Sequence, residues 1–220
     1  MTLRSSFGIS FKPNNYFEVT TADLKQKLQS IDAKKAVILG ENTNSIFNES
    51  VALDCVRYID NELSVDGSTI TAGASINWHE LVKISINNNL YGLENLAYIP
   101  GSVGASPIQN IGAYGQDVSK VIKFVECLDL ESLEIFQLTN SECNFSYRSS
   151  IFQSKKYLIT KVSFELESTF KPNLNYKSLS EYVEKNSINI SKENIIETIG
   201  RVRALRLPDI KVLPNCGSFF

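Results

Sequence analysis

The residues between Glu94 and Asp117 carry no charged side chain, and this stretch constrains the fold more than any other. It is long enough for a membrane helix, which needs roughly 20 apolar residues. Pro100, Pro107 and several glycines would break such a helix, so this segment is excluded as a membrane span. The absence of charge must therefore have another cause.

Four apolar residues indicate that the stretch is an anchored loop and not a flexible linker. They are spaced like residues held in a core: Ile99, Val103, Ile108 and Ile111. Small residues between them would let the backbone approach a flat ligand, and Ser and Asn side chains would supply hydrogen bonds. Two prolines would make the loop rigid. We therefore predict a ligand-binding loop here.

A second loop, Leu39-Gly40-Glu41-Asn42-Thr43-Asn44, is a weaker candidate for ligand binding. It follows an apolar segment that we predict to be a buried strand over residues 36–39. Successive backbone N–H groups, with hydroxyl and amide donors beside them, suit a pyrophosphate. An ordinary strand-to-loop turn has the same composition, so both interpretations stay open for this loop taken alone.

Composition and charge narrow the classes of partner. Of the 220 residues, 22 Lys and Arg nearly balance 24 Asp and Glu, which gives no basis for binding nucleic acid or an anionic membrane surface. With one histidine, His79, and four cysteines lacking CxxC spacing, we predict no metal site, no catalytic triad and reduced thiols. The N-terminus lacks the apolar core of a signal peptide, which favours a cytoplasmic protein without membrane insertion.

Residue periodicity predicts an α/β unit over residues 1–56 and an α+β unit over residues 57–170. In the first unit we expect a strand over 16–19 and a helix that begins at residues 21–24. Thr21 is the expected cap of this helix, and Leu24 and Leu28 share one face. The alternation of Phe7, Ile9 and Phe11 indicates a further strand. The second unit has predicted strands over 69–72, 121–130 and 158–166, and a helix over 77–88.

Residues 171–220 form the third predicted part. They are polar and Asn-rich at first, and then an amphipathic helix is expected over 192–205. Residues 217–220 look like a strand that enters a core. Domains rarely finish on two unpartnered aromatic residues such as Phe219 and Phe220, so we expect the chain to be truncated.

Several motifs, taken in order, carry a resemblance to a known family. They are NWHELV (77–82), GLENL (92–96), IPGSVGASPIQNIGAYG (99–115), FSYRSSIF (145–152), RLPD (206–209) and NCGSFF (215–220). In this order they resemble the UDP-N-acetylenolpyruvoylglucosamine reductases, which act in peptidoglycan precursor synthesis. The version of the loop that reads SPIQN, together with Tyr176, resembles the subtype with an extra tyrosine loop over the substrate.

The resemblance implies an α+β fold: a two-subdomain FAD-binding fold of the PCMH (vanillyl-alcohol-oxidase) type, followed by the start of a truncated α/β substrate domain. It implies FAD and NADPH as cofactors, a nucleotide-sugar substrate and a monomer. The expected cofactor-binding residues are Gly40, Glu41, Asn42, Thr43, Asn44, Gly101, Ser102, Gly104, Ala105, Ser106, Gln109, Asn110, Ile111, Gly112, Ala113, Tyr114 and Gly115.

Two residues acquire catalytic roles from the resemblance. In the family, FAD passes hydride from NADPH to the enolpyruvyl double bond of the substrate, giving UDP-N-acetylmuramate. Arg148 is then the fixed cation that grips the substrate carboxylate, and Ser218 is the proton donor to C2. Tyr147, Tyr176 and Arg206 are expected to contact the substrate. We expect a structural and not a catalytic role for His79, because it lies on a predicted helix far in sequence from the acid-base residues.

This sequence departs from the family pattern at three places. The phosphate loop usually reads Gly-x-Gly-Ser-Asn, whereas Asn42 and Thr43 stand here. Arg206 replaces the usual Lys, which keeps the charge and changes the geometry. The family's glutamate opposite the arginine has no counterpart, so we expect negligible turnover from these 220 residues. The alternatives are a non-catalytic FAD-binding remnant and a related FAD oxidase that uses oxygen.

Overall fold

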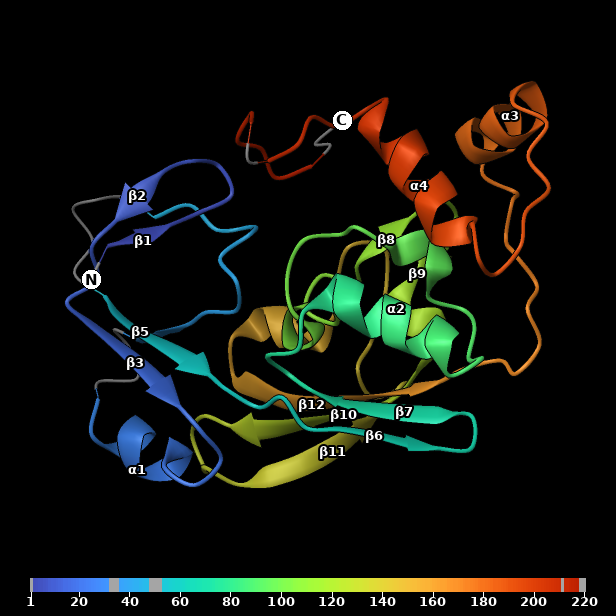
Figure 1. The fold of residues 1–220 in the computed structure, drawn as a ribbon. Coiled ribbons are helices and arrows are strands. Elements are labelled where there is room, and N and C mark those ends of the chain that lie inside the picture. The colour runs from blue at the N-terminus through green and yellow to red at the C-terminus, as the bar shows by residue number, and fades with distance from the viewer. Residues whose placement is uncertain (1, 32–35, 48–52, 211, 218–220) are drawn as a thin grey trace.

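The computed structural model describes residues 2–31, 36–47, 53–210 and 212–217, and in these residues two main sheets lie beside each other (Figure 1). The smaller sheet is parallel and has the order β3 (Asn15–Val19), β5 (Asp54–Tyr58), β4 (Ala36–Ile38). A parallel pair needs a crossover, and α1 (Leu24–Gln29) supplies it between β3 and β4. Leu24 and Leu28 are both buried, as predicted.

The larger sheet is antiparallel. Its order is β11 (Ile135–Thr139), β10 (Ile122–Asp129), β12 (Tyr157–Glu165), β7 (Thr69–Gly73) and β6 (Leu63–Asp66). Helix α2 (Trp78–Asn87) lies over one face of this sheet (Figure 1), and its Trp78 ring meets Phe164 edge-on at a centroid distance of 5.9 Å. The Asn77 side chain caps α2 by accepting the Glu80 N–H. The predicted helix and strands in this part are confirmed within a few residues.

Short elements and two further helices complete the described chain. A hairpin joins β1 (Leu3–Arg4) to β2 (Ser10–Phe11), and β8 (Gly112–Ala113) pairs with β9 (Gln116–Asp117). The 3-10 turns are η2 (Glu94–Leu96), η3 (Val103–Ala105), η4 (Val118–Lys120) and η5 (Ile151–Ser154). Helices α3 (Lys177–Lys185) and α4 (Ile195–Ala204) follow the large sheet (Figure 1).

Two local expectations were wrong. Thr21 does not cap α1, because Asp23 is the N-cap and the Thr21 hydroxyl instead lies 2.7 Å from the Tyr58 hydroxyl. Phe7 and Ile9 belong to the turn of the β1–β2 hairpin, where Gly8 has a φ of 78°. The polar region after residue 168 also contains α3, which was not predicted from the sequence; its Leu179 is fully buried, and Tyr182 and Val183 pack against the same core. The predicted strand over 217–220 falls mainly outside the described residues.

The charge-free stretch is packed against the end of β7. Gly104 N–H donates to the Ala74 carbonyl at 2.9 Å, and Val103 N–H donates to the Ile76 carbonyl at 2.8 Å. Nothing larger than glycine fits at position 104, because a Cβ there would lie 2.6 Å from the Ala74 Cβ. This segment is buried between the sheet and a cleft, which explains its lack of charge. No helix in the described residues is long and apolar enough to cross a membrane.

We predict that Gly104→Ala lowers the free energy of unfolding by about 1–3 kcal/mol, because the added methyl overlaps Ala74. Urea unfolding followed by circular dichroism measures the change. The double variant Ala74→Gly/Gly104→Ala reopens the space and should recover part of the loss, which a double-mutant cycle quantifies. An additive double variant would contradict this account.

The Glu165 carboxylate at the end of β12 gives a pH-dependent contribution to stability. Hydrogen bonds from Lys123, Ser68 and Thr69 lower the pKa of Glu165 to about 2. A carboxylate whose folded pKa is depressed stabilises the fold above its unfolded pKa and loses that contribution as pH falls toward the folded pKa. Glu165→Gln should therefore lower Tm at pH 7, and the difference should shrink as pH falls below about 4.5. A pH-independent difference would contradict this assignment.

Candidate cofactor-binding and active site

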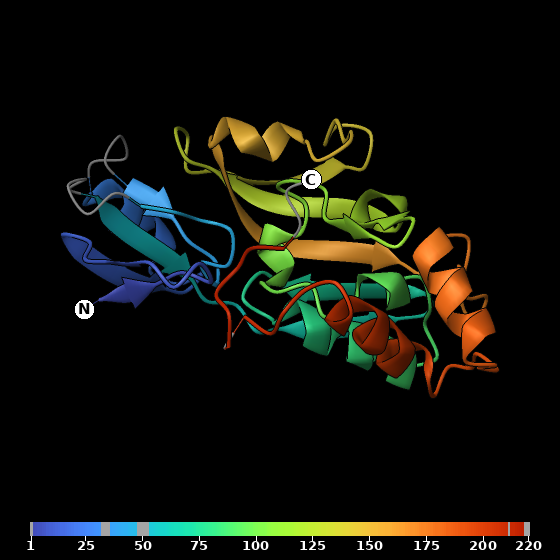
Figure 2. The same cartoon turned by 90° about the horizontal axis from the view of Figure 1, so that it is seen from above.

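A cleft of about 1140 Å³ runs between the loop after β4 and the loops above the large sheet. The C-terminal residues after α4, red in Figure 2, cross toward the N-terminal hairpin beside this cleft. Pro214 reaches that hairpin, because a Cβ added at Gly8 would lie 2.9 Å from the Pro214 Cγ. The described part of the C-terminal segment therefore forms one border of the cleft.

Most of the residues expected to bind cofactor or substrate line this one cleft. From the phosphate loop and the charge-free stretch they are Gly40, Glu41, Asn42, Thr43, Asn44, Ser102, Ala105, Ser106, Gln109, Ile111, Gly112, Ala113, Tyr114 and Gly115. The expected substrate contacts Tyr147, Tyr176 and Arg206 line it too, as does Arg148. Segments separated by more than a hundred residues thus meet around one space.

Three expected cofactor-binding residues do not line the cleft, and each has a structural contact instead. The Gly101 carbonyl accepts the Trp78 N–H at 2.9 Å, and Gly104 packs on Ala74. The Asn110 side chain donates to the Ser146 carbonyl and accepts the Ser119 N–H, each at 3.0 Å. These residues shape the wall of the cleft from behind.

The phosphate loop and the charge-free stretch touch each other directly. The Asn44 amide donates to Gln109 Oε1 at 2.8 Å, and the Thr43 hydroxyl donates to the Pro100 carbonyl at 3.4 Å. A Cβ at Gly40 would lie 3.0 Å from Ser102 Oγ, so the two loops pack closely at this glycine. The two loops that we predicted from composition form adjoining walls.

The Asn42 side chain is the clearest unmet polar group in the cleft. Asn42 has a φ of 55°, which asparagine tolerates better than most residues. Its amide nitrogen and oxygen are both buried, and neither has a hydrogen-bond partner among the residues that the structure describes. A buried amide without partners is costly, so these atoms are suited to bind a polar ligand.

Arg148 is held against the loop by backbone carbonyls. It has a φ of 52° in a turn where Ser146 and Ser149 exchange hydrogen bonds. Its guanidinium donates to the Asn110 carbonyl at 3.1 Å and to the Gly112 carbonyl at 2.7 Å, and it lies 3.7 Å from an Asp117 oxygen. These contacts fix the orientation of the cation and leave other N–H groups for an anion.

A tyrosine and arginine cluster borders the other end of the cleft. The Tyr114 and Tyr176 rings meet edge-on at a centroid distance of 5.7 Å. Arg206 and Arg203 are close enough to Tyr114 to influence its phenol, whose pKa is raised by burial. Sequence reasoning missed Arg203, although it precedes Arg206 by three residues, the spacing at which helical side chains share a face.

Burial lowers the pKa of the Arg203 guanidinium. Within the described parts of the chain, no hydrogen bond or ion pair neutralises this side chain. The expected proton donor Ser218 lies outside the described residues, but its neighbours Cys216 and Gly217 line the cleft. Ile108, predicted as a core anchor, is 40% exposed and faces the cleft instead.

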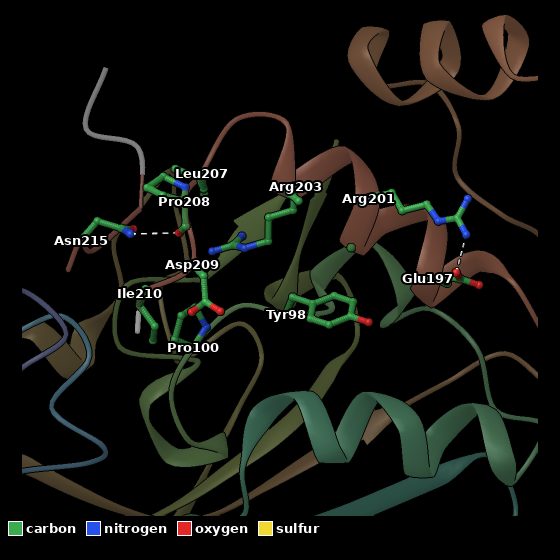
Figure 3. Close-up of a pocket in the computed structure, with 12 residues that line it drawn as sticks. Tyr98, Pro100, Glu197, Arg201, Arg203, Leu207, Pro208, Asp209, Ile210 and Asn215 are labelled. Carbon is green, nitrogen blue, oxygen red and sulfur yellow. Dashed lines mark hydrogen bonds and ion pairs between the residues drawn. The ribbon is translucent and has the colours of Figure 1, made fainter. Parts of the chain in front are cut away.

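A smaller hollow of about 450 Å³ adjoins the cleft between Tyr98 and the end of α4 (Figure 3). Pro100, Arg203 and Leu207 line both spaces. The His79 ring stacks on Tyr98 at a centroid distance of 4.1 Å, and His79 Nδ1 accepts the Tyr98 N–H at 3.2 Å. His79 thus supports Tyr98, in keeping with the structural role expected for it.

Comparisons with known proteins identify the family. The profile of the FAD binding domain matches residues 20–135. A UDP-N-acetylenolpyruvoylglucosamine reductase of Shewanella oneidensis is 38% identical over 98% of this chain and 68% of its own length. The Salmonella typhi reductase is 36% identical over 96% of this chain and 67% of its own length. The chain belongs to the UDP-N-acetylenolpyruvoylglucosamine reductase family. It spans about two thirds of the length of these relatives.

Solved structures agree on the fold. The reductase from Thermus caldophilus superimposes with a TM-score of 0.66 at 20% identity, covering 92% of this chain and 65% of that one. A solvent-stable cholesterol oxidase gives a TM-score of 0.53 at 13% identity, covering 76% of this chain and 37% of that one. The predicted α+β FAD-binding fold is confirmed, and the chain belongs to a family of FAD-dependent oxidoreductases.

The residues present fit an FAD. The cleft volume of about 1140 Å³ exceeds that of ordinary small-molecule sites, as a dinucleotide requires. The Asn42 amide has unmet hydrogen-bonding capacity beside the phosphate loop. The Glu41 carboxylate, which would repel a pyrophosphate, accepts the Asn77 amide at 3.3 Å. A Cβ at Gly112 would overlap the side chains of Asp117 and Arg148, so glycine at this position lets Arg148 pack into the wall of the cleft.

We predict that Asn42→Gly weakens FAD binding about tenfold while the stability of the apoprotein changes by less than about 1 kcal/mol. Glycine keeps the positive φ and removes only the unmet amide. Fluorescence titration with FAD and urea unfolding measure the two quantities. Gln137→Ala, which removes an exposed amide on β11 outside the cleft, is the control and should change neither quantity. Unchanged or tighter FAD binding in Asn42→Gly would show that this amide is no cofactor contact.

Proposed function

We propose that this chain is the FAD-binding portion of a reductase that uses NADPH to convert UDP-N-acetylglucosamine enolpyruvate to UDP-N-acetylmuramate. The observation that carries the proposal is the position of Arg148, a cation held by two backbone carbonyls in the wall of the FAD-sized cleft. Family membership and the arginines at the far end of the same cleft support it.

A bound FAD would supply the hydride chemistry, and the residues of the chain would supply charge and position. The loop over residues 40–44 would hold the pyrophosphate, and residues 111–115 would lie against the flat ring system. Arg148 would bind the substrate carboxylate, where negative charge increases as the double bond is reduced. Ser218 would protonate C2. Arg203 and Arg206 would bind the diphosphate, and Tyr176 would cover the sugar nucleotide.

Substrate binding to the FAD-loaded chain tests the role of Arg148. We expect Arg148→Lys to weaken binding of the enolpyruvyl substrate about tenfold, because lysine loses the bidentate carboxylate contact. Binding of UDP-N-acetylglucosamine, which lacks that carboxylate, should change by less than twofold. Perturbation of the flavin absorbance reports both affinities. Equal losses for both ligands, or no loss for either, would contradict the proposed role.

Stopped-flow absorbance distinguishes the reductase from a non-catalytic FAD-binding protein. Bleaching of the flavin by NADPH, followed by recovery when the enolpyruvyl substrate is added, supports reductase activity in these residues. Bleaching without recovery favours the FAD-binding remnant. Recovery that needs oxygen and no substrate favours an oxidase. A monomer in the cytoplasm stays a prediction, consistent with the proposed use of NADPH and a nucleotide sugar.

A further inference from the structure

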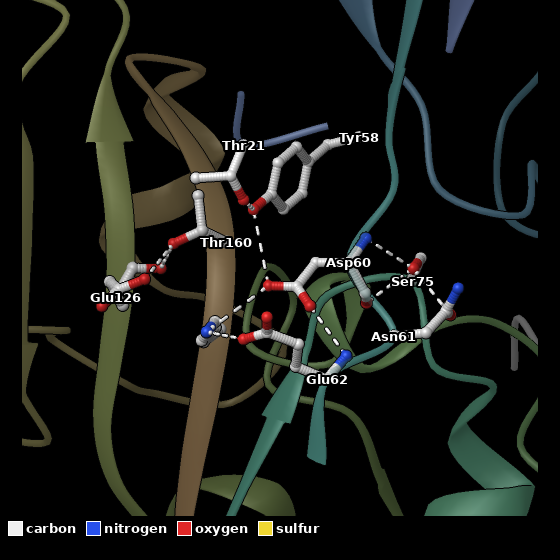
Figure 4. Close-up of polar contacts among 9 residues, drawn as sticks. Thr21, Tyr58, Asp60, Asn61, Glu62, Ser75, Glu126 and Thr160 are labelled. Atoms are coloured by element: carbon white, nitrogen blue, oxygen red, sulfur yellow. Dashed lines mark hydrogen bonds and ion pairs between the residues drawn. The ribbon is translucent and has the colours of Figure 1, made fainter. Parts of the chain in front are cut away.

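The joint between the two sheets contains a buried acidic residue. Residues 59–62 connect β5 of the small sheet to β6 of the large one, and Asp60 lies in this connection (Figure 4). Its side chain is only 4% exposed. A carboxylate is rarely buried to this degree without partners, because leaving water is costly for a charge.

The Asp60 carboxylate has partners from both sheets. One oxygen accepts the Glu62 N–H at 2.8 Å. The other lies 3.5 Å from the Tyr58 hydroxyl of β5 and 3.7 Å from Lys161 Nζ of β12. Lys161 also pairs with Glu62 at 2.6 Å, and this contact raises the pKa of Lys161 and lowers that of Glu62. Both groups are therefore charged near neutral pH.

The backbone of Asp60, like its side chain, is held by hydrogen bonds. Ser75 Oγ donates to the Asp60 carbonyl at 2.6 Å and accepts the Asp60 N–H at 2.8 Å (Figure 4). A Cβ at Gly73 would overlap the Asp60 carbonyl group, so the connection packs directly against the end of β7. This position tolerates only glycine.

Short hydrogen-bonded paths lead from the joint to both walls of the cleft. On one side, Ala74 and Ile76 accept the N–H groups of Gly104 and Val103 in the charge-free loop. On the other side, β5 holds the start of the phosphate loop, because the Val56 carbonyl accepts the Leu39 N–H at 2.8 Å. The connection at Asp60 is therefore the place where β5, which holds the phosphate loop, meets the end of β7, which holds the charge-free loop.

We propose that Asp60 is a positioning residue whose buried carboxylate sets the angle between the two sheets and so the width of the cofactor cleft. Apolar contacts between the sheets, such as those of Leu28 and Leu158, add stability but have no preferred direction. Directional hydrogen bonds and ion pairs at a buried site can specify one arrangement. The part of the proposal that concerns FAD rests on the proposed cofactor site, whereas the angle can be measured without FAD.

Spin-label distances in the apoprotein test the angle directly. Labels are placed at Lys25→Cys on α1 and Gln137→Cys on β11, both exposed, in a Cys216→Ser background. Asp60→Asn keeps the shape of the side chain and removes its charge. We expect it to shift or broaden the distance distribution. Glu62→Gln is the matched control, because it removes a carboxylate that also pairs with Lys161 but is exposed. An Asp60→Asn distribution that matches the wild type would overturn the proposal.

FAD titration separates positioning from stability. Asp60→Asn should weaken FAD binding about tenfold and Glu62→Gln by less than twofold. Leu179→Ala, in the buried face of α3 away from the joint, should lower Tm without changing FAD affinity measured well below Tm. If Leu179→Ala weakens FAD binding as much as Asp60→Asn does, the proposal is wrong.

If Asp60→Asn does not fold, Ser75→Ala takes its place. This variant removes the two hydrogen bonds between Ser75 Oγ and the Asp60 backbone, and it must shift the label distance. If the wild-type protein does not bind FAD, the proposed function is wrong. The spin-label distances would still test whether Asp60 sets the angle between the sheets.

Discussion

The contact between the charge-free loop and the end of β7 is the constraint on which the rest of the site depends. Backbone N–H groups of Val103 and Gly104 bind the carbonyls of Ile76 and Ala74, and no Cβ fits at Gly104. A charged side chain in this layer would be buried without a partner on the sheet side. The loop can therefore present only neutral groups to a ligand, and the cationic groups must come from other segments.

Those segments arrive from distant parts of the sequence. Arg148 comes from a turn before β12, Arg203 from the last turn of α4, and Arg206 from the residues that follow it. The division matches the chemistry proposed for the cleft. A neutral wall suits a flat ring system, and guanidinium groups at the border suit carboxylate and diphosphate groups.

Sequence reasoning succeeded where the signal was local and failed where a tertiary contact decided the outcome. The helix predicted over 77–88 is α2, and the structure shows that Asn77 caps it and that its buried residues share one face. Threonine is a residue type that often caps helices, but the Thr21 hydroxyl is hydrogen-bonded to that of Tyr58, 37 residues away. Ile108 looked like a core anchor, yet it faces the cleft. The domain boundaries and the roles of the site residues stay predictions, and Ser218 lies outside the described residues.

We propose that the two loops and the cleft between them bind one FAD through its pyrophosphate. A titration of the apoprotein with FAD, followed by flavin fluorescence and by ³¹P NMR, tests it most directly. We expect saturation at one equivalent, with both pyrophosphate resonances shifted as the fluorescence is quenched. Absence of saturable binding, or quenching with unchanged phosphorus resonances, would contradict it.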